Sequence, residues 1–294
     1  MPRISVNEST TYHWSLLEDV TGFQAAGIPG IGVWRRKLAD FGEERGVELL
    51  RESKLEVTCF SSAGGFTGSD GQTFREAVDD ALEALRLAAE MRAGCLVVVS
   101  GAKAGHTFNH ARRLVREALV ELGDAAAAHN LQIAVQFMHR LPVERWSFIN
   151  TLDAAVELLA GCRHARVGMV FDLFHFWREP ELCRRIPQIV PWIKLAALTD
   201  ARLPAQTDDD RCLPGQGDLP LAEIITALEN GGYRGAYDVQ LISERCRESD
   251  YESLLADCRK SLGQLVPALL PTAESPPRPH PVSEIVLAPA PPQR

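Results

Sequence analysis

Short apolar runs alternate with longer amphipathic stretches along this chain of 294 residues. Runs such as CLVVVS and VGMVF are apolar without alternation, as strands are when both faces of a parallel sheet are covered. The runs recur about every 30 residues, which is the length of one βα unit. The predicted strands are Ile4–Asn7, Ile31–Trp34, Val57–Ser61, Cys95–Ser100, Gln132–Gln136, Val167–Asp172, Ile193–Leu198 and Ala236–Leu241.

The stretches between these strands have helical periodicity and recognisable ends. Ser15 and Glu18 in SLLE predict a capping box that opens a helix over Leu16–Ala26. Gly27 follows this helix and is typical of a residue that ends one. Further helices are predicted in TFREAVDDALEALRLAAEM and over Ala111–His129, Leu221–Asn230 and Tyr251–Leu269.

Eight βα units without a break in composition predict a single (β/α)8 TIM barrel over residues 1–270. An open, doubly wound sheet is the competing fold, and the count and even spacing of the strands disfavour it. After Pro271 the composition becomes Pro-rich and loses its periodicity. Residues 271–294 are therefore predicted to form an extended or disordered tail.

Composition narrows the class of protein. A net charge of -8 and a pI near 5.5 argue against a nucleic-acid partner. The seven cysteines are scattered and include no CxxC pair, which fits reduced thiols in a cytoplasm. No signal segment and no bilayer-spanning apolar run stand out, so we expect a cytoplasmic protein without a membrane partner.

Phosphate-binding motifs give little support for a nucleotide cofactor. The chain has no GxxxxGK[ST], and no GxGxxG follows its first strand. Lys103, in the loop GAKAG after the fourth strand, could meet a phosphate or carboxylate, or could be a solvated loop lysine. Arg211 opens the turn-rich segment RCLPGQGDLPL and could clamp an anionic group. That segment could equally be a structural loop in which Asp218 caps the next helix.

Polar side chains at the carboxyl ends of three predicted strands carry the candidate chemistry. Gln136, Asp172 and Gln240 end the runs LQIAVQ, VGMVFD and GAYDVQ. In a TIM barrel such ends face the active-site mouth. His139 and His175 follow shortly after, and each could donate to a substrate hydroxyl, shuttle a proton, or hold a loop in place.

Several segments resemble the sugar phosphate isomerase/epimerase family of xylose isomerase-like TIM barrels. The resemblance covers roughly Ile4–Leu269 and is carried by AGIPGIGVW, LQIAVQFMH, INTLDAAVELL, VGMVFDLFHFW, RCLPGQGDLPL and GGYRGAYDVQL. It implies a divalent metal held by Glu, Asp, His and Glu at the ends of strands five to eight. It also implies that the two glutamates move protons while the metal polarises a carbonyl.

The residues at those four positions make the implied metal site degenerate. They are Gln136, Asp172, Ala197 and Gln240, so that one carboxylate of the set is retained. Hard divalent cations need carboxylate charge to offset their dehydration. We therefore expect no metal, or weakly bound Mn, Mg, Co or Zn, with Asp172, Gln136 and Gln240 as its ligands.

The same substitutions bear on catalysis, because an amide cannot act as a general base at neutral pH. Asp172, His175 and His139 are the candidates to carry protons in place of the glutamates. The predicted substrate-binding residues are Gln136, Gln240, Arg211 and Lys103.

Together these observations predict an isomerase- or epimerase-like protein for a small polyhydroxylated sugar or sugar phosphate. Its metal-dependent catalysis is expected to be impaired or altered. A metal-free carbohydrate-binding pseudoenzyme and a scaffold protein are the alternatives, and whether it is an enzyme stays open, as does a homo-oligomer.

Overall fold

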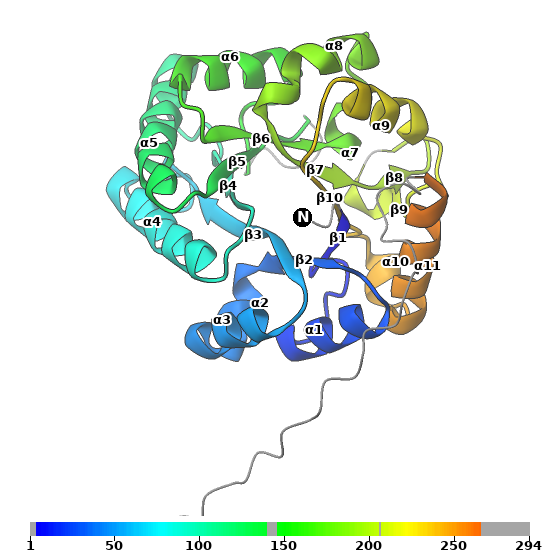
Figure 1. Cartoon of the computed structure of the whole chain (residues 1–294). Coiled ribbons are helices and arrows are strands. Elements are labelled where there is room, and N and C mark those ends of the chain that lie inside the picture. Colours follow the sequence, from blue (N-terminus) through cyan, green and yellow to red (C-terminus); the bar gives the residue numbers. More distant parts are fainter. Residues whose placement is uncertain (1–3, 140–145, 206, 266–294) are drawn as a thin grey trace, which may run out of the picture.

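The computed structural model describes residues 4–139, 146–205 and 207–265, and its eight parallel strands close into a barrel (Figure 1). The strands run round the barrel in chain order, and β1 pairs with β10 to complete the ring. The predicted (β/α)8 barrel is thereby confirmed. The barrel strands are β1 (Ile4–Asn7), β2 (Gly30–Trp34), β3 (Glu56–Gly64), β4 (Cys95–Val99), β5 (Gln132–Gln136), β6 (Val167–Asp172), β7 (Ile193–Leu198) and β10 (Ala236–Val239).

Helices surround this ring of strands (Figure 1). None of the helices within the described ranges is long and apolar enough to cross a membrane. They are α1 (Leu16–Ala25), α2 (Arg35–Phe41), α3 (Glu43–Glu52), α4 (Phe74–Glu90), α5 (Phe108–Ala128), α6 (Leu152–Cys162), α7 (Leu173–Phe176), α8 (Leu182–Ile189), α9 (Leu221–Asn230), α10 (Glu244–Arg247) and α11 (Tyr251–Leu265), with two 3-10 turns at Val190–Trp192 and Asp208–Asp210.

The helix ends confirm one predicted cap and correct another. Ser15 accepts from the Glu18 backbone, and Glu18 closes the capping box on Ser15, as SLLE predicts. Asp218, by contrast, does not cap α9, whose N-cap is Pro220. The Asp218 carboxylate instead accepts from the Leu203 backbone N–H at 2.9 Å, because the loop before α9 folds back onto the segment after β7. The predicted domain boundary at residue 270 and the tail lie outside the described residues.

Two apolar layers build the core. A large cluster fills the space between the strands and the outer helices. A small cluster fills the barrel interior and consists of Cys59, Cys95, Val97, Ala134, Val170, Leu195 and Ala197.

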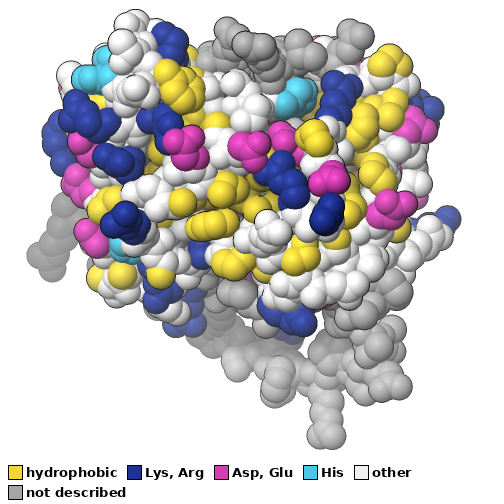
Figure 2. Space-filling view, turned by 90° about the horizontal axis from the view of Figure 1, so that it is seen from above, with side chains coloured by type: hydrophobic (Ala, Val, Ile, Leu, Met, Phe, Trp, Pro, Cys, Tyr) yellow, Lys and Arg dark blue, Asp and Glu magenta, His cyan; other side chains and the backbone are white. Residues whose placement is uncertain are grey.

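On the outer flank shown in Figure 2, acidic and basic side chains are interspersed with hydrophobic ones.

A buried charged cluster ties the end of β1 to α1 and α2. Lys37 Nζ lies 2.6 Å from Asp19 Oδ2 and donates to the Thr11 carbonyl at 2.7 Å. Glu8 is fully buried beside them and accepts from the Trp34 backbone N–H at 2.6 Å. Burial, followed by the nearby Asp19 charge, raises the pKa of Glu8 well above its usual value. Burial also raises the pKa of Asp19, to about 6.

We predict that Glu8→Gln flattens the pH dependence of folding. A carboxyl whose folded pKa is raised stabilises the fold below its unfolded pKa and loses that contribution as pH rises through the folded value. A tenfold difference in proton affinity between the folded and unfolded chain corresponds to about 1.4 kcal/mol of folding free energy. Urea unfolding between pH 5 and 8 should show a smaller loss of stability for the variant than for the native chain.

The matched control is Glu18→Gln on the neighbouring helix. The pKa of Glu18 is lowered, first by its hydrogen bond with the Ser15 backbone, so this residue works in the opposite direction. The Glu18→Gln substitution should not reduce the loss of stability between pH 5 and pH 8. A Glu8→Gln profile as steep as that of the native chain would contradict a raised pKa of Glu8 in the folded protein.

Candidate functional site

The carboxyl ends of the strands bring the polar residues of the candidate site to one mouth of the barrel. Gln136 and Asp172 are the last residues of β5 and β6, and Gln240 directly follows β10. Ala197 is fully buried and pairs in register with Asp172 on one side and Asp238 on the other. Closure of the barrel therefore places all four positions of the implied metal site around the same rim.

Asp172 is the centre of the first network of contacts at this mouth. Its side chain is buried, and its Oδ1 accepts from the Phe174 backbone N–H at 2.9 Å. Its Oδ2 accepts from Gln136 Nε2 at 3.1 Å and from Arg211 Nη2 at 3.3 Å. Burial acts to raise the pKa of this carboxyl, but the charge of Arg211, the neighbouring His175 and the hydrogen bonds from Arg211 and the Phe174 backbone together outweigh burial, so the pKa is lowered. Asp172 is therefore an ionised acceptor at neutral pH.

Arg211 reaches Asp172 from a short hairpin after β7. The hairpin pairs β8 (Asp200–Ala201) with β9 (Arg211–Cys212). The Asp200 carboxylate holds the following loop by accepting from four backbone N–H groups at 2.8–3.0 Å, those of Ala201, Gly215, Gly217 and Leu219. A Cβ on Gly217 would lie 2.3 Å from Asp200 Oδ1, so the loop needs glycine there. The buried guanidinium also stacks 4.2 Å from the centre of the Phe174 ring.

The two histidines form a pair whose tautomers follow from Arg211. Arg211 Nη2 lies 3.4 Å from His175 Nε2, and a guanidinium can only donate. His175 Nε2 therefore accepts, and the hydrogen of that ring sits on Nδ1. His175 Nδ1 lies 2.7 Å from His139 Nδ1, so His139 accepts there and carries its own hydrogen on Nε2. In this arrangement Nδ1 of His139 is the acceptor of the contact between the two rings.

Gln240 belongs to a second network, around Asp238. Its Nε2 donates to Asp238 Oδ2 at 3.0 Å, and Asn7 Nδ2 donates to the same oxygen at 2.9 Å. Ser5 Oγ donates to Asp238 Oδ1 at 2.5 Å. Burial raises the pKa of Asp238, against the lowering effect of these hydrogen bonds.

The structure thus brings five of the predicted residues into direct contact. The first network contains Gln136, Asp172, Arg211, His175 and His139, and the second contains Gln240. Lys103 is exposed in the loop after β4, where its Nζ donates to the His106 carbonyl at 2.8 Å. That contact favours a structural role for Lys103, and its role in substrate binding stays a prediction.

Asp238 and Asp200 are the residues that sequence reasoning missed. Asp238 lies inside a strand, two positions before Gln240, so the alternation of a strand places both on the inner face. An acidic residue amid the apolar run GAYDVQL was the available signal. Asp200 had no comparable signal, because its four partners follow it by one to nineteen residues.

A metal ion does not fit the donors that the described residues bring to the mouth. Across the described residues, no group of three His, Cys, Asp or Glu side chains is placed to hold one. Asp172 is already neutralised by Arg211, Gln136 turns its amide nitrogen towards Asp172, and Ala197 has no donor.

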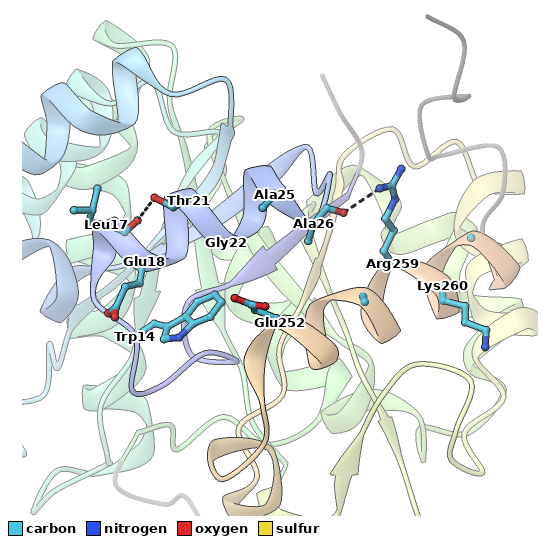
Figure 3. A pocket seen from close by; sticks show the side chains of 12 residues that line it. Trp14, Leu17, Glu18, Thr21, Gly22, Ala25, Ala26, Glu252, Arg259 and Lys260 are labelled. Carbon is cyan, nitrogen blue, oxygen red and sulfur yellow. Dashed lines mark hydrogen bonds between the residues drawn. The ribbon is translucent and has the colours of Figure 1, made fainter. Parts of the chain in front are cut away.

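A separate groove lies on the outside of the barrel between α1 and α11 (Figure 3). It has a volume of about 1070 Å³ and is lined by side chains that include Trp14, Leu17 and Arg259. Arg259 donates to the Ala26 carbonyl across the groove at 3.0 Å. None of the predicted site residues lines it, so it is separate from the mouth.

The chain is similar in sequence to several known proteins. The chain is 24% identical over 259 residues to 3-dehydroshikimate dehydratase of Pseudomonas putida, an alignment that covers 84% of this chain but 39% of that protein. It is 28% identical over 129 residues to inosose isomerase of Bacillus velezensis, covering 42% and 45% of the two chains. The chain thus spans less than half the length of these relatives in each alignment.

A solved structure of the IOLI protein, which holds a zinc atom, has the same fold. It superposes with a TM-score of 0.80 at 20% identity and covers 91% of this chain and 99% of that one. The family model for the xylose isomerase-like TIM barrel matches residues 21–260. With the closed barrel and the polar strand ends, this match shows that the chain belongs to the xylose isomerase-like TIM barrel family.

Proposed function

We propose that this protein binds a small polyhydroxylated sugar or sugar phosphate in the barrel mouth, as an isomerase- or epimerase-like protein with impaired or altered metal-dependent catalysis. The family and the relative named inosose isomerase support the class of ligand. The single observation that carries the change in catalysis is the contact of Gln136 and Arg211 with Asp172.

The amides explain how the mouth can do without a metal. A glutamate at position 136 would place a second carboxylate about where Gln136 Nε2 now lies, 3.1 Å from Asp172. Two such carboxylates repel unless a cation or a shared proton lies between them. Gln136 replaces that repulsion by an N–H···O hydrogen bond. Gln240 does the same beside Asp238.

The side chains that remain are suited to binding more than to proton abstraction. Asp172 is buried and its pKa is lowered, so that it is a weak base. Arg211 stays the predicted contact for an anionic group. The His139–His175 pair, whose Nδ1 atoms lie 2.7 Å apart, stays a candidate for proton transfer.

The alternative is a carbohydrate-binding protein without turnover. Its support is specific: neither Gln136 nor Gln240 can ionise, and the one retained carboxylate is held by Arg211. Losing one positioned base typically costs about 10²–10⁴-fold in rate, and here both are replaced.

We predict that the purified protein holds well under one equivalent of Mn, Co, Mg or Zn by elemental analysis. Restoring the family's ligands with Gln136→Glu, Ala197→His and Gln240→Glu together should raise Mn²⁺ affinity in a calorimetric titration, since carboxylates and imidazole supply the missing donors. Stoichiometric metal in the native protein would contradict the metal-free proposal. No gain in the triple variant would show that the ligand positions are misplaced.

We predict that Gln136→Glu alone destabilises the fold by about 1–3 kcal/mol at pH 8, because it loses a buried donor and adds like charge. The pKa of the new carboxyl should be raised beside Asp172. Its protonated form can donate as the amide does, so stability should return as pH falls and be lost as pH rises.

The measurement is urea unfolding at pH 5 and pH 8, with Gln132→Glu as control. Gln132 is the half-buried first residue of the same strand, away from the mouth. Equal behaviour of the two variants at both pH values would argue against the Gln136–Asp172 contact.

We predict that sugars or sugar phosphates raise the melting temperature, since a ligand that binds the folded state must stabilise it. Inosose, keto-sugars and their phosphates are the first panel. For each binder, deuterium uptake from D₂O next to the carbonyl then separates an isomerase from a binding protein. If none of the panel shifts the melting temperature, a scaffold role takes the place of this proposal.

A further inference from the structure

We infer that Asp172 and Asp238 fix the orientation of the Gln136 and Gln240 amides, so that both amide oxygens face the mouth as acceptors for ligand hydroxyl groups. Asp238 is then a positioning residue, which acts on the ligand through Gln240. This inference rests on the proposed carbohydrate function. It adds that the two amides recognise hydrogen-bond donors of the ligand.

The orientation of Gln240 follows from a chain of contacts that begins at the backbone. The Ser9 backbone N–H donates to Asn7 Oδ1 at 3.0 Å. Asn7 must therefore turn its Nδ2 towards Asp238, where it donates to Oδ2 at 2.9 Å. Gln240 Nε2 donates to the same Asp238 oxygen at 3.0 Å, so the amide nitrogen of Gln240 faces Asp238. Asp238 Oδ1 accepts from Ser5 Oγ, so both oxygens of this carboxylate are acceptors in the structure.

The orientation of Gln136 is fixed in the same way. Both oxygens of Asp172 accept, one from the Phe174 backbone N–H and the other from Arg211. Gln136 can therefore only donate to Asp172, from Nε2. The same nitrogen lies 3.5 Å from the Phe137 carbonyl, which is also only an acceptor.

The two amide oxygens are left for a ligand. No described residue donates a hydrogen bond to either oxygen. Both also differ from the fully buried polar atoms without a partner, because neither belongs to that set. They lie at the ends of β5 and β10, which are three strands apart in the ring. A ligand must bring donors to both, which suits hydroxyl groups and disfavours a carboxylate or phosphate at these two points.

The surroundings of Asp238 show why it holds this position. Its side chain is fully buried and contacts β1 through Ser5 and Asn7. A Cβ on Gly32 of β2 would lie 2.8 and 2.9 Å from the two Asp238 oxygens, so the neighbouring strand leaves room for the carboxylate.

The first test needs no ligand. In NMR, the side-chain NH₂ protons of Gln240, assigned by their loss in Gln240→Ala, should exchange slowly with water in the native protein. Asp238→Asn keeps an acceptor and should keep exchange slow, whereas Asp238→Ala should speed it by about 10-fold or more. The Gln136 NH₂ is the internal control and should not change. Unchanged Gln240 exchange in Asp238→Ala, or equally fast exchange in Asp238→Asn, would overturn the inference.

The second test uses inosose and its mono-O-methyl ethers as probes. The native protein and Asp238→Asn should prefer inosose to at least one ether by about 10-fold, because the methyl group removes a donor. Asp238→Ala should reduce that preference while still unfolding cooperatively. Equal affinity of the native protein for inosose and every ether would overturn the inference but leave the proposed function standing. If slow Gln240 exchange is found and neither inosose nor the sugar panel binds, the proposed function fails and hydroxyl recognition fails with it.

Discussion

The candidate site depends on the buried ion pair between Asp172 and Arg211. The end of β6 supplies the carboxylate, and the hairpin after β7 supplies the guanidinium. Both side chains are almost fully removed from water, at 1% and 4% exposed. Removing one partner of such a pair typically costs about 3–5 kcal/mol, because the other charge is left uncompensated. Asp200 supports this pair indirectly, because its carboxylate holds the loop that follows Arg211.

This pair sets the state of its neighbours. Because Asp172 is ionised, Gln136 must donate to it, and because Arg211 can only donate, His175 must accept from it. The tautomer of His139 follows in turn. A single fixed charge pair therefore determines which atoms of the neighbouring side chains are donors and which are acceptors. Such preorganisation favours specific binding, since few polar groups need to reorient when a ligand arrives.

The sequence predicts the barrel and the strand ends well, because period, length and spacing are local properties. Gln136 and Asp172 end β5 and β6 as the apolar runs indicate. Asp238 and the buried Glu8 were not predicted, because their roles depend on which strands and helices become neighbours. The alternative interpretation of Asp218 as a helix cap was wrong for the same reason: its partner, the Leu203 backbone, comes from an earlier part of the loop.

The differences from the family's metal site form one consistent set and are coupled physically. A site with three carboxylates needs a cation to offset their charge, whereas here one carboxylate faces one guanidinium and the pair is neutral. Glutamate at position 136 or 240 would place a second carboxylate beside Asp172 or Asp238, and without a metal that arrangement is repulsive. Effects of substitutions within one hydrogen-bonded network are not additive. Gln136 is therefore coupled to Arg211 through Asp172, whereas Gln240 is coupled to Asp238, and the full metal site is tested by restoring the whole set of ligands.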